Sequence, residues 1–258
     1  LKVIAYDVST MATESIADTG GTFTGDVTFA DGAELITASA GTNNVRLGEN
    51  AGASIASGGN NNTTIGYNAG NAITTGDKNT AVGVGALDAN TTASNNTAFG
   101  YNSASSNVTG TDITAIGYQA LEDATSGQYN TALGARAAAN LTSGDFNTAI
   151  GRDTLSGAVT GDGNVAVGNA SMAANTSGEA NTAVGRNTLA VNTTGDHNVA
   201  IGKDALDANT TADFNVAVGN FCLSANTTGT TNVGVGSYAL GLTTTGNRNV
   251  AVGQTALY

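Results

Sequence analysis

Few side chains in this sequence are of the kinds that commonly carry chemistry. Among 258 residues there is one histidine, His197, and one cysteine, Cys222. Nucleophilic catalysis needs a base beside the nucleophile, and catalytic zinc usually needs histidine ligands. His197 lies in the stretch TTGDHN, and the corresponding stretches elsewhere hold Lys78, Tyr129 or Phe146 instead. His197 is therefore interpreted as a solvated turn residue, and the chain is not expected to be an enzyme.

The cysteine and the glycines likewise give no indication of catalytic or cofactor chemistry. A single cysteine cannot form an intrachain disulfide, and positions related to Cys222 hold Ala86, Ala120 or Thr154. Cys222 is thus predicted to be a small packed residue. The many glycines are not followed by G-K-[ST], so they do not form a phosphate loop. No cofactor is expected.

Acidic residues recur at a spacing that would bring them together. In a stacked repeat they would form a column spaced ~4.8 Å apart. Ca²⁺ favours clustered carboxylate and carbonyl oxygens, so this column is a candidate row of divalent-cation sites. The preferred interpretation is structural, because Asp suits a glycine-containing turn by bonding to its own backbone. The acids, 17 residues apart, are Asp145, Asp162, Glu179, Asp196 and Asp213.

A 17-residue repeat must position all of these residues. Its centre is a glycine, and after a first interval of 18 residues every interval is 17. A period this constant leaves no room for insertions, so each unit must stack on the last in one fixed way. The central glycines are Gly48, Gly66, Gly83, Gly100, Gly117, Gly134, Gly151, Gly168, Gly185, Gly202, Gly219, Gly236 and Gly253.

The residues before each central glycine have the pattern of a β-strand. An apolar residue immediately precedes the glycine, Ala usually stands two before it, and Thr or Val three before it. Alternation in a short β-branched run predicts one strand, and a second short strand is expected after the glycine, around ALDAN at 86–90. Asn stands four before every central glycine except Gly117, where Ile113 replaces it, and stacked amides at this position can bond along a ladder. Glycosylation of N-x-T is the rival interpretation. Representative units contain Asn79, Ala81, Val82 and Gly83, and Asn181, Ala183, Val184 and Gly185.

These patterns predict an all-β fold: a parallel β-solenoid of about 13 coils, roughly 60 Å long. Residues 41–258 would form the repeat shaft. Residues 1–40 lack the repeat and are expected to be an attachment or capping region that covers the open first edge. The chain has no Pro or Trp, 36 Gly and a net charge of −12. Nucleic-acid binding is therefore not expected, nor is membrane insertion, since no apolar run approaches the ~20 residues of a membrane helix.

The repeat N-[TV]-A-[VIL]-G-x-x-[AST]-[AL] over residues 44–258 resembles that of trimeric autotransporter adhesin heads. This resemblance implies a left-handed parallel β-roll and an obligate trimer. The stretch GGTFTGDVTF at 20–29 is similar to segments that recur in bacteriophage tail fibres. The two resemblances imply different carriers. One is a virion fibre, a rigid shaft for host attachment docked to other virion proteins through residues 1–40. The alternative is a bacterial surface adhesin.

Two further expectations concern surfaces. The apolar residues before the central glycines would form a stripe that parallel trimerisation would bury. The residues after the glycine vary freely, as an outward-facing turn would allow. Within them, Tyr101 and Tyr118 are candidates for a platform that binds sugar rings of a host glycan, although a solvated edge is the simpler interpretation. Adjacent threonines such as Thr193 and Thr194 would point to opposite faces of a strand, which disfavours ice binding.

Overall fold

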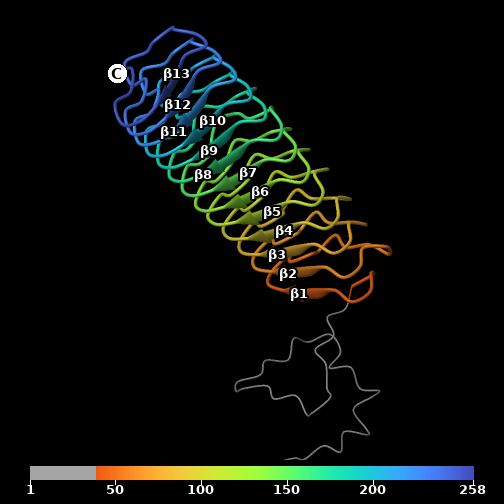
Figure 1. Cartoon of the computed structure of the whole chain (residues 1–258). Coiled ribbons are helices and arrows are strands. Elements are labelled where there is room, and N and C mark those ends of the chain that lie inside the picture. The colour runs from red at the N-terminus through yellow and green to blue at the C-terminus, as the bar shows by residue number, and fades with distance from the viewer. Residues whose placement is uncertain (1–38) are drawn as a thin grey trace, which may run out of the picture. The chain divides into compact units, whose positions relative to one another are not determined.

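The computed structural model describes residues 39–258, which wind into one continuous β-solenoid (Figure 1). Each coil contributes one strand of three residues to a single 13-stranded parallel sheet in sequence order. No helix occurs in residues 39–258. The expected attachment region at 1–40 lies almost entirely outside the described residues, as does the tail-fibre-like stretch at 20–29. The strands are β1 (Val45–Leu47), β2 (Thr63–Ile65), β3 (Thr80–Val82), β4 (Thr97–Phe99), β5 (Thr114–Ile116), β6 (Thr131–Leu133), β7 (Thr148–Ile150), β8 (Val165–Val167), β9 (Thr182–Val184), β10 (Val199–Ile201), β11 (Val216–Val218), β12 (Val233–Val235) and β13 (Val250–Val252).

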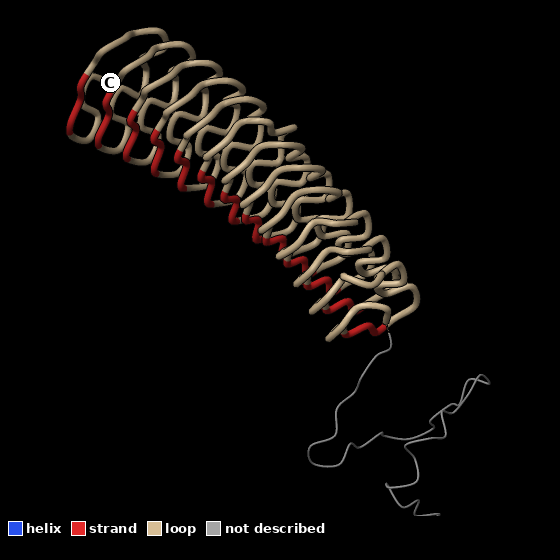
Figure 2. The backbone as a smooth tube through the Cα atoms, turned by 90° about the vertical axis from the view of Figure 1, so that its right-hand side faces the viewer, coloured by secondary structure: helices blue, strands red, loops and turns tan. Residues whose placement is uncertain are grey.

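The register of the sheet follows the sequence repeat. Ala81 of β3 pairs with Ala98 of β4, which pairs with Ala115 of β5, so each residue lies beside its equivalent one period away. The first pair, Val45 with Thr63, takes up the interval of 18. The predicted parallel β-solenoid with a 17-residue period is thereby confirmed, with 13 strands separated by 12 intervals. Figure 2 shows the strands as one column along the rod, with loops completing every coil.

The second strand expected around 86–90 is wrong, since each coil of the described part has only one strand. The reason is backbone conformation. Three positions in a coil adopt the left-handed region, as at Phe146 (φ 59°), Asp153 (φ 54°) and Leu155 (φ 49°). In the predicted segment Leu87 has φ 51°, which a strand cannot contain. Each coil therefore turns repeatedly after its strand instead of extending again.

The left-handed turns are stabilised by bonds between coils. The Leu87 N–H donates to the Ser103 carbonyl of the next coil at 3.0 Å, and the Leu121 N–H donates likewise to Ala137 at 3.0 Å. Left-handed backbone is costly for residues with a Cβ, so these stacked bonds offset a penalty that the local sequence alone would not overcome. The loops are consequently as regular as the strands.

The central glycine is required for two reasons. Gly134 has φ 135°, a conformation that side chains rarely adopt. A Cβ added there would also lie 2.6 Å from the carbonyl oxygen of Gly151 in the next coil. The backbones of successive coils approach so closely here that the central glycine position has no room for a side chain.

The interior is narrow and filled by small residues. The alanines two before each glycine, such as Ala81, Ala132 and Ala183, are fully buried. A leucine column, represented by Leu155 and Leu189, fills the rest of the cross-section. The larger apolar residues next to the glycines point outward, so the alanine side of each strand is the inner one.

Two columns of buried asparagines stiffen this interior. In the first, the Asn181 side-chain oxygen accepts the Asn198 backbone N–H at 2.9 Å, and its amide donates to the Gly195 carbonyl at 2.8 Å. In the second, the Asn209 side-chain amide donates to the Asn192 side-chain oxygen at 2.9 Å. Buried polar groups of this kind fix the stacking register, because a slipped coil would leave them unpaired.

Candidate interaction surface

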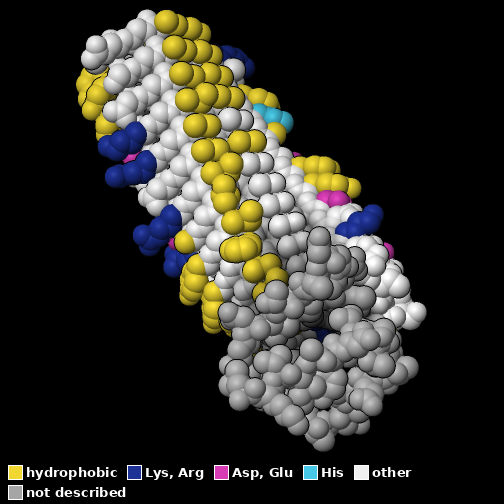
Figure 3. All heavy atoms as spheres, turned by 90° about the horizontal axis from the view of Figure 1, so that it is seen from below, with side chains coloured by type: hydrophobic (Ala, Val, Ile, Leu, Met, Phe, Trp, Pro, Cys, Tyr) yellow, Lys and Arg dark blue, Asp and Glu magenta, His cyan; other side chains and the backbone are white. Residues whose placement is uncertain are grey.

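The outer face of the sheet carries a continuous apolar stripe. It is formed by the residue before each central glycine. We call the strand face this residue together with the one three before the glycine, which is Thr in β2 to β7 and β9 and Val in the other strands. Phe99 is 56% exposed and Leu133 45%, and Ile116 is also exposed. Figure 3 shows the hydrophobic column running along the rod, with Lys and Arg side chains set to its side. Monomeric proteins rarely leave long contiguous apolar patches in water, so this stripe is a candidate contact surface.

One edge of this stripe is formed by the first corner, the two residues after each central glycine. Tyr101 and Tyr118 stack there in neighbouring coils, with ring centroids 5.5 Å apart and planes 11° from parallel. Phe221 and Tyr238 stack further along at 5.1 Å, and the Lys203 ammonium lies 4.8 Å from the Phe221 ring centroid. The two tyrosines predicted as a sugar platform thus lie together at the surface, but their stacked faces cover one another.

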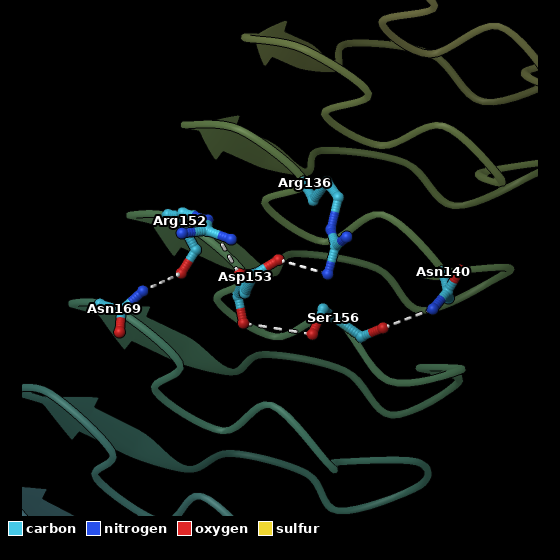
Figure 4. A network of polar contacts seen from close by, with 6 residues as sticks. All are labelled: Arg136, Asn140, Arg152, Asp153, Ser156 and Asn169. Atoms are coloured by element: carbon cyan, nitrogen blue, oxygen red, sulfur yellow. Dashed lines mark hydrogen bonds and ion pairs between the residues drawn. The ribbon is translucent and has the colours of Figure 1, made fainter.

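The middle of the first corner is charged. Arg136 and Arg152 both pair with Asp153, at 2.7 Å and 3.1 Å (Figure 4). The Asn169 side-chain amide donates to the Arg152 carbonyl at 3.2 Å, and the Asn140 amide donates to Ser156 at 2.7 Å. This network links successive coils, and since both arginine side chains are largely exposed to solvent each ion pair contributes at most about 1 kcal/mol.

A second corner, the residue five before each central glycine, carries aromatic stacks that the sequence analysis did not single out. Tyr129 and Phe146 stack at 4.9 Å with planes 6° apart, and His197 and Phe214 stack at 5.1 Å with planes 9° apart. His197 is a turn residue at the surface, beside a phenyl ring. The signal was present in the constant spacing of 17, which places Tyr129 directly beside Phe146, and His197 beside Phe214.

The turn acids lie in one column, but their bonding differs from the Asx turn that was expected. The Asp145 carboxylate accepts the Gln128 backbone N–H at 2.7 Å, and Asp162 accepts the N–H of Asp145 at 2.7 Å. Asp213 accepts the N–H of Asp196 at 2.8 Å in the same manner. Each of these carboxylates therefore connects to the preceding coil and not to its own backbone. Within residues 39–258 no cluster of three His, Cys, Asp or Glu side chains could hold a metal ion.

The buried thiol is unsuited to nucleophilic chemistry. Cys222 is fully buried, and burial raises its pKa to about 11. The thiolate is the reactive form of cysteine, so this side chain stays protonated and inert near neutral pH. It functions in packing, as one of the residues that line the narrow interior.

No family model matches the chain, and no curated protein matches it. In the described part of the chain no helix is long and apolar enough to cross a membrane. The residues that this structure offers for interaction are the strand face and the two corners.

Proposed function

We propose that the chain is the shaft of a virion fibre, a non-catalytic rod that holds a host-attachment structure away from the particle. The observation that carries the proposal is the uninterrupted register of the coils. Thirteen strands stack in register, with one extra residue in the first interval and none in the later ones, and buried asparagines bond one coil to the next. With ~4.8 Å per coil the rod spans roughly 58 Å from β1 to β13. A rod of this kind can hold an attachment structure at a fixed distance from the particle.

We further propose that three copies associate in parallel through the strand face. Exposed side chains such as Phe99, Ile116 and Leu133 need cover from water. Because all coils are equivalent, parallel chains in the same register would bring like residues together at each height, as closed symmetry requires. Residues 1–40 would dock to other virion proteins, and the corners would remain available to a host-surface glycan or protein.

The oligomeric state is tested by sedimentation of the purified chain. A stable trimer is expected. Phe99→Lys and Leu133→Lys, which place charge on the strand face, should shift it toward monomer, whereas Phe146→Lys on the second corner should not. A stable, soluble monomer of the unmodified chain at micromolar concentration would contradict the association.

The alternative is a surface adhesin of a bacterium, a class whose head-domain repeat this repeat motif resembles. An antibody raised against the purified chain separates the two carriers. Labelling of purified virions in electron micrographs supports the fibre, whereas labelling of intact bacterial cells supports the adhesin.

A further inference from the structure

The first corner contains an interrupted row of tyrosines. Tyr67, Val84, Tyr101 and Tyr118 each follow the central glycine in four consecutive coils, and we call them the tyrosine row. Their alignment is fixed by the backbone. The Gly85 N–H donates to the Tyr67 carbonyl at 3.0 Å, and equivalent bonds of 2.9 Å join the next coils to Val84 and Tyr101.

At Val84 the row has a small aliphatic side chain in place of an aromatic ring. Tyr101 and Tyr118 stack at 5.5 Å and occupy each other's facing sides, but Tyr67 and Tyr101 are two coils apart, about 10 Å, with a small aliphatic side chain between them. The three tyrosines are 49%, 49% and 52% exposed. The row therefore lacks one ring at a position where backbone bonds hold the neighbouring residues in register.

The residues beside the interruption are uncharged amides. The Asn68 side-chain oxygen accepts a bond from Asn50 at 3.1 Å, and its own NH₂ has no acceptor among the described residues. On the other side, a Cβ at Gly85 would lie 2.5 Å from the side-chain oxygen of Asn102, so that oxygen occupies the space beside Gly85. A donor and an acceptor thus flank the coil that lacks the ring.

We propose that a neutral pyranose ring binds between Tyr67 and Tyr101, over Val84 and Gly85. A sugar ring sandwiched there would present its C–H faces to two electron-rich aromatic faces. The space between the two tyrosines is wide enough for one sugar ring. Their separation of about 10 Å would leave about 5 Å between the centre of the sugar and each aromatic ring, close to the 5.5 Å between the stacked rings of Tyr101 and Tyr118. The amides of Asn68 and Asn102 would bond neighbouring hydroxyls.

The local charge favours a neutral sugar over an acidic one. Between Leu47 and Ala135 the sequence has a single basic residue, Lys78, and it lies on the second corner. The nearest charged group with a bond to the row's amides is Glu122, which accepts from Gln119 at 2.8 Å and from Asn102 at 3.3 Å. Sialylated glycans would meet this carboxylate without a compensating cation.

This inference rests on the proposed function, because it names the ligand class for the rod's surface, and its test separates the two. The full chain is applied to an array of immobilised neutral oligosaccharides of glucose, galactose and N-acetylglucosamine, with sialylated counterparts. Saturable binding to neutral glycans is expected. The strongest neutral binder is then titrated against variants.

Val84→Tyr completes the row and fills the site, so binding should weaken about tenfold or more although an aromatic residue has been added. The fold should persist, since tyrosine is native at the equivalent position in three coils. Tyr67→Ala, which removes one wall, should weaken binding about tenfold. Phe146→Ala on the second corner is the matched control and should leave binding unchanged.

Absence of glycan binding by the full chain would overturn the site. So would unaltered binding by Val84→Tyr, which would assign recognition to an outer tyrosine face. A change in oligomeric state caused by Tyr67→Ala would also overturn it, because the row would then be a contact between chains. If the chain is a trimer but binds no glycan, the proposed shaft stands and only the sugar site is overturned, so the two proposals can fail separately.

Discussion

The sulfur of Cys222 occupies the space that a side chain at Gly234 would need. A Cβ added to Gly234 would lie 2.5 Å from the Cys222 sulfur. Gly234 pairs with Ala217 and Ala251 in a column that otherwise holds alanine in this part of the sheet. The two departures from the repeat therefore compensate one another across adjacent coils.

The first prediction is a double-mutant cycle on this pair. Gly234→Ala alone should destabilise the fold by about 1–3 kcal/mol through overpacking, and Cys222→Ala alone by about 1 kcal/mol through a small cavity. Together they restore the pairing of two alanines found in other coils. The double variant should match or exceed the native stability, because Ala in a strand costs less entropy than Gly. Additive effects in chemical denaturation would contradict this coupling.

The second prediction separates backbone strain from contact between coils. Gly134→Ala combines a forbidden φ of 135° with a Cβ 2.6 Å from the Gly151 oxygen, so it should destabilise by at least about 3 kcal/mol. Gly253→Ala has a similar φ of 129°, but its Cβ meets nothing closer than 3.9 Å. This control should lose only about 1–3 kcal/mol. Equal losses in thermal denaturation would mean that the close approach between coils is unimportant.

The third prediction concerns the buried amides. Asn181→Ala leaves the Asn198 N–H and the Gly195 carbonyl without their side-chain partner. The expected loss is about 2–4 kcal/mol, since buried groups left unsatisfied are costly. The exposed Asn169 makes one bond to Arg152, and Asn169→Ala should change stability by less than about 0.5 kcal/mol. Similar melting temperatures for the two variants would argue against the ladder.

The fold was predictable because periodicity carries positional information that single residues do not. Alternation before each glycine indicated the strand, and the constant Ala at Ala81, Ala98 and their equivalents indicated the tight inner side. What could not be predicted was the turn geometry. Leu87 and Leu155 are ordinary strand or helix formers by propensity, yet they adopt left-handed backbone, because bonds to neighbouring coils override the local preference.

The candidate surface was predictable only in part, for a similar reason. Tyr101 and Tyr118 were singled out because they follow a glycine in adjacent repeats, and the same argument applied to Tyr129 and Phe146 would have found the second corner. The partner of Asp145 was not accessible from sequence. An Asx turn and a bond to the preceding coil require the same residue type, and only the stacking of the coils decides between them.

The fourth prediction is a pH dependence at Asp207. Burial, and then the neighbouring Asp204 carboxylate, raise the pKa of Asp207 above its ordinary 3.8. One of its carboxylate oxygens is buried without a hydrogen-bond partner in the described structure. Because the folded pKa is the higher one, the folded state favours the protonated acid, and stability is lost as the pH rises through that value. Ionised Asp207 is therefore unfavourable at neutral pH.

Asp207→Ser tests this effect, since Ser224 occupies the equivalent position in the next coil. Relative to the native chain, the variant should gain stability as the pH rises from below about 3.8 toward neutrality. At acid pH, where the carboxyl is protonated in both states, the stability difference between the two chains should become independent of pH, which serves as an internal control. Urea denaturation at a series of pH values measures the difference, and a pH-independent difference would contradict the assignment.

The last prediction concerns the acid column as a metal site. One oxygen of Asp145, Asp162 and Asp213 already accepts a backbone N–H from the preceding coil, whereas Ca²⁺ takes six to eight oxygen ligands. Chelation with EDTA should therefore shift the melting temperature by less than about 2 °C, corresponding to less than ~1 kcal/mol for a domain of this size. A large decrease that Ca²⁺ reverses would show that the column binds metal.

Removing carboxylate charges from the acid column should stabilise the fold slightly. Asn247 accepts the Thr230 N–H at 2.7 Å in the same column, so asparagine preserves the bond between coils. Asp162→Asn together with Asp196→Asn should keep the fold and raise its stability by a few tenths of a kcal/mol at low ionic strength, since carboxylates ~4.8 Å apart repel. High salt should remove the gain by screening that repulsion. Destabilisation by the double variant at low salt would mean that the carboxylate charges themselves support the turn.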